Sequence, residues 1–232
     1  FAADLIDWGR KNQPRAVADL ATRLHIDDEA VKTWRSLAAR VVKRRGRNRV
    51  WEQHRGFFDL ESIDLTRFDP RRSGMFGLLP EERLQKTQII KQADVVMALA
   101  LFPDDCGSRS DHLRNWNYYL PRTDHGSSLS RAAHSRVASQ LGLVDTAYDF
   151  FRQAIAIDLE DSMGNGRDGV HAATQGGVLQ AALFGFAGLR LGAKGPHANP
   201  RLPSHWDFFN FTTTFRGKQQ QWETTNRKGA TS

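Results

Sequence analysis

Two adjacent serines, Ser127 and Ser128, stand directly before a segment whose apolar residues recur at helical spacing from Leu129 to Leu141. The first turn of a helix carries free backbone amides and the positive end of the helix dipole, and nearby hydroxyl groups add further hydrogen-bond donors. Such a helix start suits a phosphate or a carboxylate. Capping of the helix by one of the serines explains the same residues without any ligand.

A histidine and a lysine precede two other apolar segments. His171 lies in a glycine-containing stretch ahead of the apolar run that begins at Val178. Its imidazole could donate a hydrogen bond or a proton to an oxyanion, or it could be a buried histidine bonded to a carbonyl. Lys91 and Gln92 open another apolar segment. A lysine entering a buried helix is costly unless it faces an anion or a sugar, although a lysine that reaches surface water would also fit.

Helices must carry most of these segments, because apolar residues recur with a helical period along most of the chain. Residues 46–80 lack a sustained period and predict a long ordered loop. After Pro200 the apolar residues alternate with polar ones, as in strands. The expected helices are 1–8, 14–24, 27–45, 91–101, 111–119, 128–141, 144–159 and 178–191, and the expected strands are 209–215 and 220–225. The sequence predicts a mainly α domain at 1–194, with no strand in it, and the start of a β domain at 195–232, with a frayed polar end at 226–232.

Composition excludes several classes of protein. The chain has 232 residues, of which 40% are hydrophobic, so it can bury a substantial core. The longest apolar run, 95–102, is far shorter than the ~20 residues that span a bilayer. Cys106 is the single cysteine and the eight histidines include no pair spaced on one helix face, so neither a disulfide nor a metal site is expected. We expect a soluble, cytoplasmic protein without a membrane partner.

The net charge of +7 is concentrated in one stretch. Seven basic residues lie between Arg40 and Arg55 against Glu52 alone, which gives +6 there. One interpretation is a solvated helix end, where cations suit the helix dipole. The other is a non-catalytic helical protein that binds nucleic acid through this patch. The helical segments have unequal lengths and no fixed repeat, which argues against a helical repeat protein, and we expect no nucleic-acid partner.

Seven segments, in order and in register from about residue 1 to 217, resemble glycoside hydrolase family 65, which includes inverting phosphorylases of maltose, trehalose, kojibiose and nigerose. The matching segments are 52–53 with 56–60, 91–95, 115–123, 125–130, 168–172, 185–190 and 199–203. The resemblance implies the second half of an (α/α)6 barrel followed by the first strands of a C-terminal β-sheet domain.

The same resemblance implies roles for individual residues. Lys91 and Gln92 would bind the glucosyl unit. The phosphate-binding residues would be Ser127, Ser128 and His171, with His125 lining the same pocket. His54 and Arg55 stand where family members usually carry an aromatic and an acidic residue, which bears on recognition of the leaving sugar.

The implied reaction is phosphorolysis of an α-glucoside to β-glucose 1-phosphate and a free sugar or acceptor. Phosphate is already anionic, so this reaction needs a general acid but no basic carboxylate, and inorganic phosphate acts as a co-substrate without a cofactor. The resemblance puts the acidic glutamate before Phe1, so we expect no catalytic residue in this chain and an inactive isolated fragment. The expected partners are a disaccharide, phosphate, a missing N-terminal half or second chain, and further copies in a homo-oligomer. The alternative within the family is an α-glucoside hydrolase.

Overall fold

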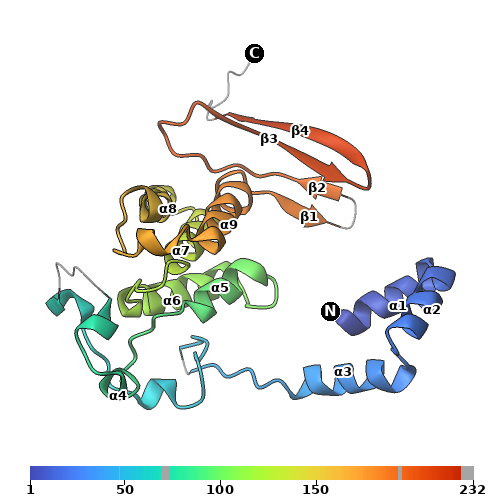
Figure 1. Ribbon diagram of the computed structural model, residues 1–232, viewed down its shortest axis with the longest axis horizontal. Coiled ribbons are helices and arrows are strands. Elements are labelled where there is room, and N and C mark those ends of the chain that lie inside the picture. The colour runs from blue at the N-terminus through green and yellow to red at the C-terminus, as the bar shows by residue number, and fades with distance from the viewer. Residues whose placement is uncertain (47, 69–73, 193–194, 226–232) are drawn as a thin grey trace. The chain divides into compact units, whose positions relative to one another are not determined.

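The computed structural model describes residues 1–46, 48–68, 74–192 and 195–225. The chain forms two compact units, Phe1–Arg44 and Arg45–Ser232, which are described separately below. It is mainly helical and has short strands toward its C-terminal end, as the sequence predicts (Figure 1). The expected frayed end at 226–232 lies outside the described residues.

The first unit consists of α1 (Ala2–Asn12), α2 (Pro14–Arg23) and α3 (Asp28–Arg40). Its small core packs Ala3, Ile6 and Val31 together. The Asp27 side chain caps α3 by accepting from the backbone nitrogen of Ala30 at 2.7 Å. The helix predicted at 27–45 therefore starts where expected but ends at Arg40, and the basic residues that follow are not part of a helix end.

The second unit is built on helical hairpins joined by short connections. Its longer elements are α5 (Asp94–Leu101), α6 (Arg109–Tyr119), α7 (Ser130–Gln140), α8 (Val144–Leu159), α9 (Ala172–Gln180) and the π-helix η6 (Ala181–Phe186). The long ordered loop predicted before them is confirmed in its described part, which carries only η1 (Phe57–Asp59), η2 (Leu65–Phe68) and η3 (Met75–Gly77) up to residue 80, with α4 (Glu81–Leu84) next. Short turns η4 (Leu120–Arg122) and η5 (Gly166–Asp168) join the longer helices.

The last helix differs from its prediction. It was expected at 178–191, where the apolar run lies, but it begins at Ala172 and continues directly into η6. The backbone nitrogen of Ala187 bonds to the carbonyl of Ala182 at 2.9 Å, the five-residue spacing of a π turn. The glycines before the apolar run are therefore inside the helix rather than ahead of it.

Helices α5, α7 and α9 run in the same direction. Between α7 and α9, a Cβ built on Gly177 would lie 2.8 Å from that of Ala132, and one turn further along both helices Arg136 donates to Gln180 at 2.9 Å. Between α5 and α7, Met97 and Ala132 line one cavity, and further along both helices Arg136 donates to the Ala100 carbonyl at 2.6 Å. The starts of these three helices therefore lie at one end of the unit.

The main core of the second unit includes buried residues of α5 and α7. It contains Tyr119, Phe57, Leu99 and Phe186, all buried. The Tyr119 hydroxyl donates to the carbonyl of Trp51, so the long loop is fixed to α6. This contact holds the loop residues next to the helix starts.

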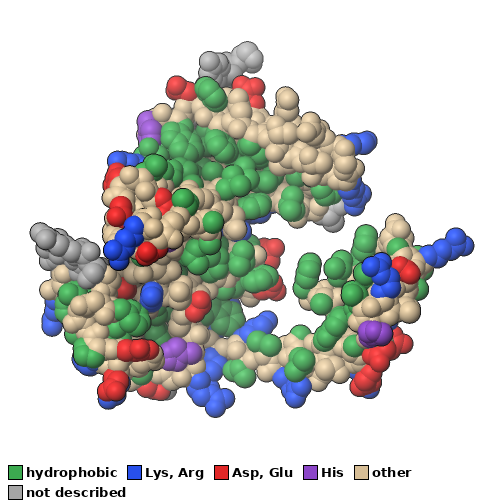
Figure 2. Space-filling view, in the orientation of Figure 1, with side chains coloured by type: hydrophobic (Ala, Val, Ile, Leu, Met, Phe, Trp, Pro, Cys, Tyr) green, Lys and Arg blue, Asp and Glu red, His purple; other side chains and the backbone are tan. Residues whose placement is uncertain are grey.

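Four strands form two antiparallel pairs in the described residues: β1 (Arg190–Gly192) with β2 (Gly195–His197), and β3 (Phe208–Phe215) with β4 (Lys218–Thr225). The two strands predicted near the C-terminus are confirmed, whereas β1 lies upstream of residue 195, where no strand was expected. Phe211 stacks on Trp222 across the longer hairpin, with ring centroids 5.7 Å apart. Hydrophobic side chains gather between this hairpin and α8 (Figure 2), where Trp206 contacts Phe151 and Phe209.

Candidate functional site

The serine pair lies at the start of α7 but does not cap it. The N-cap of α7 is Leu129, so the capping interpretation of the sequence is wrong. Ser127 is buried, and its Oγ accepts from the backbone nitrogen of Leu129 at 3.4 Å while its carbonyl accepts from the Ser130 hydroxyl at 3.0 Å. Because the Ser127 Oγ acts only as an acceptor in this contact, its hydrogen can be donated to a ligand. Ser128 is half-buried, and its side chain forms no hydrogen bond within the described residues.

His171 is the N-cap residue of α9. Its Nδ1 donates to Asp158 Oδ1 at 2.6 Å and its backbone nitrogen donates to Asp158 Oδ2 at 3.1 Å. One carboxylate therefore binds both the ring and the backbone of His171. Its Nε2 lies 3.3 Å from the side-chain nitrogen of Asn165. Hydrogen bonds from His171 and Gln175 hold the pKa of Asp158 below its usual value, against the opposing effect of burial.

The parallel arrangement of α7 and α9 brings these two segments near each other. Leu129, next to Ser128, and Ala173, two residues after His171, line the same cavity of about 210 Å³. Both segments lie at the starts of helices, so both direct the positive ends of helix dipoles to the same side of the unit. The structure therefore gathers the predicted anion-binding residues at adjoining helix starts. Gly177 in the same glycine-containing stretch lies where α9 packs on α7, since a Cβ there would be 2.8 Å from that of Ala132.

Lys91 and Gln92 lie in the loop before α5, which begins at Asp94 rather than at residue 91 as predicted. Gln53 donates to the Gln92 carbonyl at 3.3 Å and to Asp94 Oδ2 at 2.8 Å, which fixes this loop. Both side chains are exposed, and the Lys91 ammonium lies 5.0 Å from the centroid of the Phe76 ring.

A short parallel bridge joins the lysine loop to the serine segment. Ile90 pairs with Thr123, and the backbone nitrogen of Asp124 donates to the Ile90 carbonyl at 2.9 Å. Lys91 and Gln92 follow Ile90 directly, and His125 follows Asp124. The bridge thus positions the predicted sugar-binding loop beside the chain that leads into the serine pair.

A cavity of about 220 Å³ opens beside Lys91 and Gln92. Its wall also contains Gln53, His54 and Phe76, so amide, imidazole and ammonium groups lie next to an aromatic ring. A few polar groups placed on a largely apolar wall are typical of small-molecule sites. This is the end of the unit at which the three helices begin.

His125 and His134 support the serine turn from inside. His125 adopts a left-handed backbone conformation, with φ of 55°, and its Nδ1 lies 3.0 Å from the Ser130 hydroxyl. The His134 ring packs 4.7 Å from that of His125, centroid to centroid, and its Nδ1 donates to the Ser130 carbonyl at 2.8 Å. Burial lowers the pKa of His134 to about 4, so His134 is neutral near pH 7. His125 thus contacts Ser130, two residues after Ser128, while its place in a phosphate pocket stays a prediction.

Sequence reasoning missed Asp158, Asn165 and Gln175, all of which contact His171 or its partner carboxylate. Asp158 ends an amphipathic helix, where an acidic residue carries no signal of a role elsewhere. A histidine needs a partner to fix its orientation, and that requirement is the only clue that the sequence offered.

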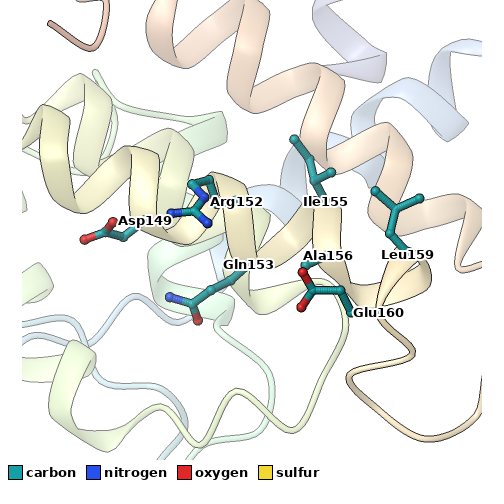
Figure 3. A pocket seen from close by; sticks show the side chains of 7 residues that line it. All are labelled: Asp149, Arg152, Gln153, Ile155, Ala156, Leu159 and Glu160. Atoms are coloured by element: carbon teal, nitrogen blue, oxygen red, sulfur yellow. The ribbon is translucent and has the colours of Figure 1, made fainter. Parts of the chain in front are cut away.

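Another cavity, of about 470 Å³, lies along α8 and is separate from these residues (Figure 3). Every side chain that lines it comes from α8 or its C-cap residue: Asp149, Arg152, Gln153, Ile155, Ala156, Leu159 and Glu160. It contains no predicted site residue, and one helix surface alone brings no groups together from different segments.

Several residues of the basic stretch are used inside the protein. Arg45 donates to the Cys106 carbonyl at 2.9 Å and stacks on Trp51, 3.9 Å from the ring centroid. Arg49 binds the buried carboxylate of Asp111 through two nitrogens, at 2.7 and 2.9 Å. Arg47 lies outside the described residues. These contacts favour a structural role for this part of the patch.

No helix in the described ranges has the length and apolar composition needed to cross a bilayer. Across residues 1–46, 48–68, 74–192 and 195–225, His, Cys, Asp and Glu side chains nowhere gather in a group of three that could hold a metal ion.

The known proteins that this chain resembles in sequence include several phosphorylases. The kojibiose phosphorylase of Halothermothrix orenii is 29% identical over 217 residues, which cover 93% of this chain and 28% of that protein. The kojibiose phosphorylase of Escherichia coli K12 is 36% identical over 174 residues, covering 74% of this chain and 23% of the relative. The 1,2-alpha-glucosylglycerol phosphorylase of Bacillus selenitireducens is 30% identical, covering 92% and 29%. The chain thus spans less than a third of the length of these relatives.

A solved structure and a family model agree with this result. The structure, described as a kojibiose phosphorylase from human microbiome, superposes with a TM-score of 0.77 at 27% identity and covers 90% of this chain and 28% of that one. The model of the glycosyl hydrolase family 65 central catalytic domain matches residues 4–180. The helical architecture, the residues gathered at the helix starts and these matches together place the chain in glycosyl hydrolase family 65.

Proposed function

We propose that this chain is part of an inverting disaccharide phosphorylase, in which inorganic phosphate displaces the leaving sugar from an α-linked glucoside and yields β-glucose 1-phosphate. The observation that supports this proposal most is the shared direction of α7 and α9, which brings the serine pair and His171 to adjoining helix starts. The relatives named above are phosphorylases, and their substrates come to this chain only as part of the proposal.

In this proposal, Ser127, Ser128 and His171 bind the phosphate. The serine hydroxyls donate to phosphate oxygens, the positive ends of the two helix dipoles attract the anion, and His171 Nε2 accepts the hydrogen of the phosphate's own hydroxyl group. A hydrogen bond to a charged group contributes roughly 1.5–3 kcal/mol, so a few such donors hold the nucleophile in position against the anomeric carbon. Because the nucleophile is already charged, no basic carboxylate is required beside it.

Lys91 and Gln92 bind the glucosyl unit at the mouth of the 220 Å³ cavity. The loop that carries Lys91 and Gln92 is joined by the parallel bridge between Ile90 and Thr123 to the segment that leads into the serine pair. The sugar and the phosphate would therefore bind side by side. The Lys91 ammonium and the Gln92 amide supply donors for sugar hydroxyls, and Phe76 supplies an apolar surface for the ring. His54 lines the same cavity and would contact the leaving sugar or the glucosyl unit.

The general acid is proposed to come from outside these 232 residues. Among the described glutamates, Glu52 accepts from the backbone nitrogen of Gly56 at 2.7 Å and Glu61 binds Arg83 at 2.7 Å, so both have structural contacts. Neither lies in the segments that form the anion site. On this proposal the chain alone releases no sugar phosphate. It forms the second half of the helical barrel, and other parts of the protein supply the first half.

The test is the phosphate dependence of the reaction. The intact protein, given an α-linked glucose disaccharide, is expected to release glucose 1-phosphate only when inorganic phosphate is supplied, measured by quantifying glucose 1-phosphate and free glucose. His171→Ala is expected to raise the KM for phosphate more than the KM for the disaccharide. Equal release of free glucose in phosphate-free buffer would contradict the proposal and favour the hydrolase alternative.

A further inference from the structure

The carboxylate of Asp158 receives three donors from the first turn of α9. It accepts from His171 Nδ1 at 2.6 Å, from the His171 backbone nitrogen at 3.1 Å and from the side-chain nitrogen of Gln175 at 3.0 Å. Asp158 lies in the last turn of α8. One side chain therefore joins the end of α8 to the start of α9, at the N-cap residue of α9.

This contact determines how the His171 ring is oriented. The side chains of His171 and Asp158 are only 18% and 15% exposed, so the pair is largely shielded from water. An ionised carboxylate can only accept, so Nδ1 must carry a hydrogen. Nε2 then carries only a lone pair and accepts from the Asn165 amide nitrogen at 3.3 Å, a place that a ligand hydroxyl can take. Because the same carboxylate also binds the His171 backbone nitrogen, the residue is held both at its ring and at its backbone.

We propose that Asp158 is a positioning residue of the phosphate site, which fixes the ring orientation and tautomer of His171 so that the lone pair of Nε2 accepts the hydrogen of the phosphate's own hydroxyl group. Gln175 in turn holds Asp158 through its second oxygen. This inference rests on the proposed function, because it takes phosphate as the ligand of His171. It adds a residue that touches neither sugar nor phosphate and acts through another side chain, as partners of ligand-binding histidines do in metal sites.

The experiment uses Asp158→Asn and a matched control, Asp149→Asn, which changes the same residue type on an exposed part of the same helix (Figure 3). Long-range ¹⁵N–¹H correlation spectra of the histidine-labelled intact protein report which ring nitrogen carries the hydrogen. His171 is identified by the signal that is lost in His171→Ala. In the unchanged protein and in Asp149→Asn, Nδ1 is expected to be protonated, whereas Asp158→Asn is expected to show a mixture of tautomers or the Nε2–H form.

Binding of inorganic phosphate is measured on the same samples by calorimetry. Asp158→Asn is expected to weaken phosphate binding about tenfold, the loss of one charge-assisted contact, while Asp149→Asn leaves it unchanged. If Asp158→Asn does not fold, as judged by circular dichroism and its melting temperature, Gln175→Leu is used in its place. That variant removes one support of the carboxylate and is expected to weaken phosphate binding in the same direction by about two- to threefold.

The outcomes separate this inference from the proposed function. An unchanged His171 tautomer in Asp158→Asn, or unchanged phosphate binding in that variant while His171→Ala loses it, would overturn the positioning role. Unchanged phosphate binding in His171→Ala itself would refute the phosphate site, even if the tautomer still depends on Asp158. Loss of both the tautomer and the affinity in Asp158→Asn, with neither lost in Asp149→Asn, supports the inference.

Discussion

At the scale of single residues, the candidate site depends on polar side chains whose hydrogen bonds hold the turn before α7 in place. His134 is the buried example: its Nδ1 donates to the Ser130 carbonyl, and burial keeps the ring neutral. Its neighbour His125 contacts the Ser130 hydroxyl. Two histidine rings therefore hold Ser130, the first residue of α7, and the turn before it depends on His134 staying uncharged.

Acid is expected to destabilise the second unit through His134. The pKa of His134 is about 4 in the folded protein and about 6.5 when unfolded, so the unfolded state binds the proton more readily. The neutral ring's contribution is fully present above pH 6.5 and is lost as the pH falls through 4, by roughly 3 kcal/mol in total. Urea unfolding at pH 7 and pH 5 should show this loss in the unchanged protein and a smaller one in His134→Gln, and an equal loss in both would contradict it.

At the scale of elements, the close packing of α7 and α9 sets the distance between the two predicted phosphate-binding segments. A side chain at Gly177 would meet the Cβ of Ala132 at 2.8 Å, whereas nothing lies within 4 Å of a Cβ at Gly176. The packing of α9 on α7 therefore leaves no room for a side chain at Gly177, whereas Gly176 has room for one.

Gly177→Ala is expected to destabilise the protein by about 1–3 kcal/mol, because the added methyl group pushes α9 away from α7. Gly176→Ala is the matched control and should be neutral or stabilising by up to about 1 kcal/mol, since alanine favours the helix. Chemical denaturation of both variants compares these effects. Equal stabilisation by the two substitutions would show that the helices are not in close contact at Gly177.

The sequence predicted the elements better than the contacts between them. Helix α8 was expected at 144–159 and spans those residues, because its apolar period is clear and Gly142 separates it from α7. Helix α9 was misplaced because its first turns are rich in glycine and lack an apolar period. The predicted site segments all lie at helix starts, but Asp158 is thirteen residues from His171 along the chain. Its role depends on how α8 meets α9, which no local pattern shows.

At the scale of the second unit as a whole, arginines gather at the C-terminal ends of the helices whose starts carry the site. Arg201 donates to the carbonyls of Ser139 and Gln140, and Arg136 donates to that of Ala100. Arg190 donates to the carbonyl of Phe184 at 3.0 Å. These guanidinium groups satisfy carbonyls that the helices leave unbonded and offset the negative end of each dipole. Burial lowers the pKa of Arg136 to about 10, which leaves it charged near pH 7.

Arg201→Ala is expected to lower the free energy of unfolding by about 1–2 kcal/mol, because two helix-end carbonyls lose their donor. Phosphate affinity should not change, since the contact is at the opposite end of α7 from the serine pair. Arg216→Ala, in the exposed turn between β3 and β4, is the control and should alter neither quantity. Denaturation and phosphate titration test both points, and a large loss of phosphate affinity in Arg201→Ala would show that the two ends are coupled.

The same polarity makes the two ends of the helices differ in their response to ionic strength. Dissolved salt screens an anion approaching the open amide ends, whereas the arginine contacts at the other end are partly shielded from water and are screened much less. Added salt that does not bind the site will therefore weaken ligand attraction well before it weakens the fold, so buffers that leave the protein fully intact can still mask its affinity for phosphate.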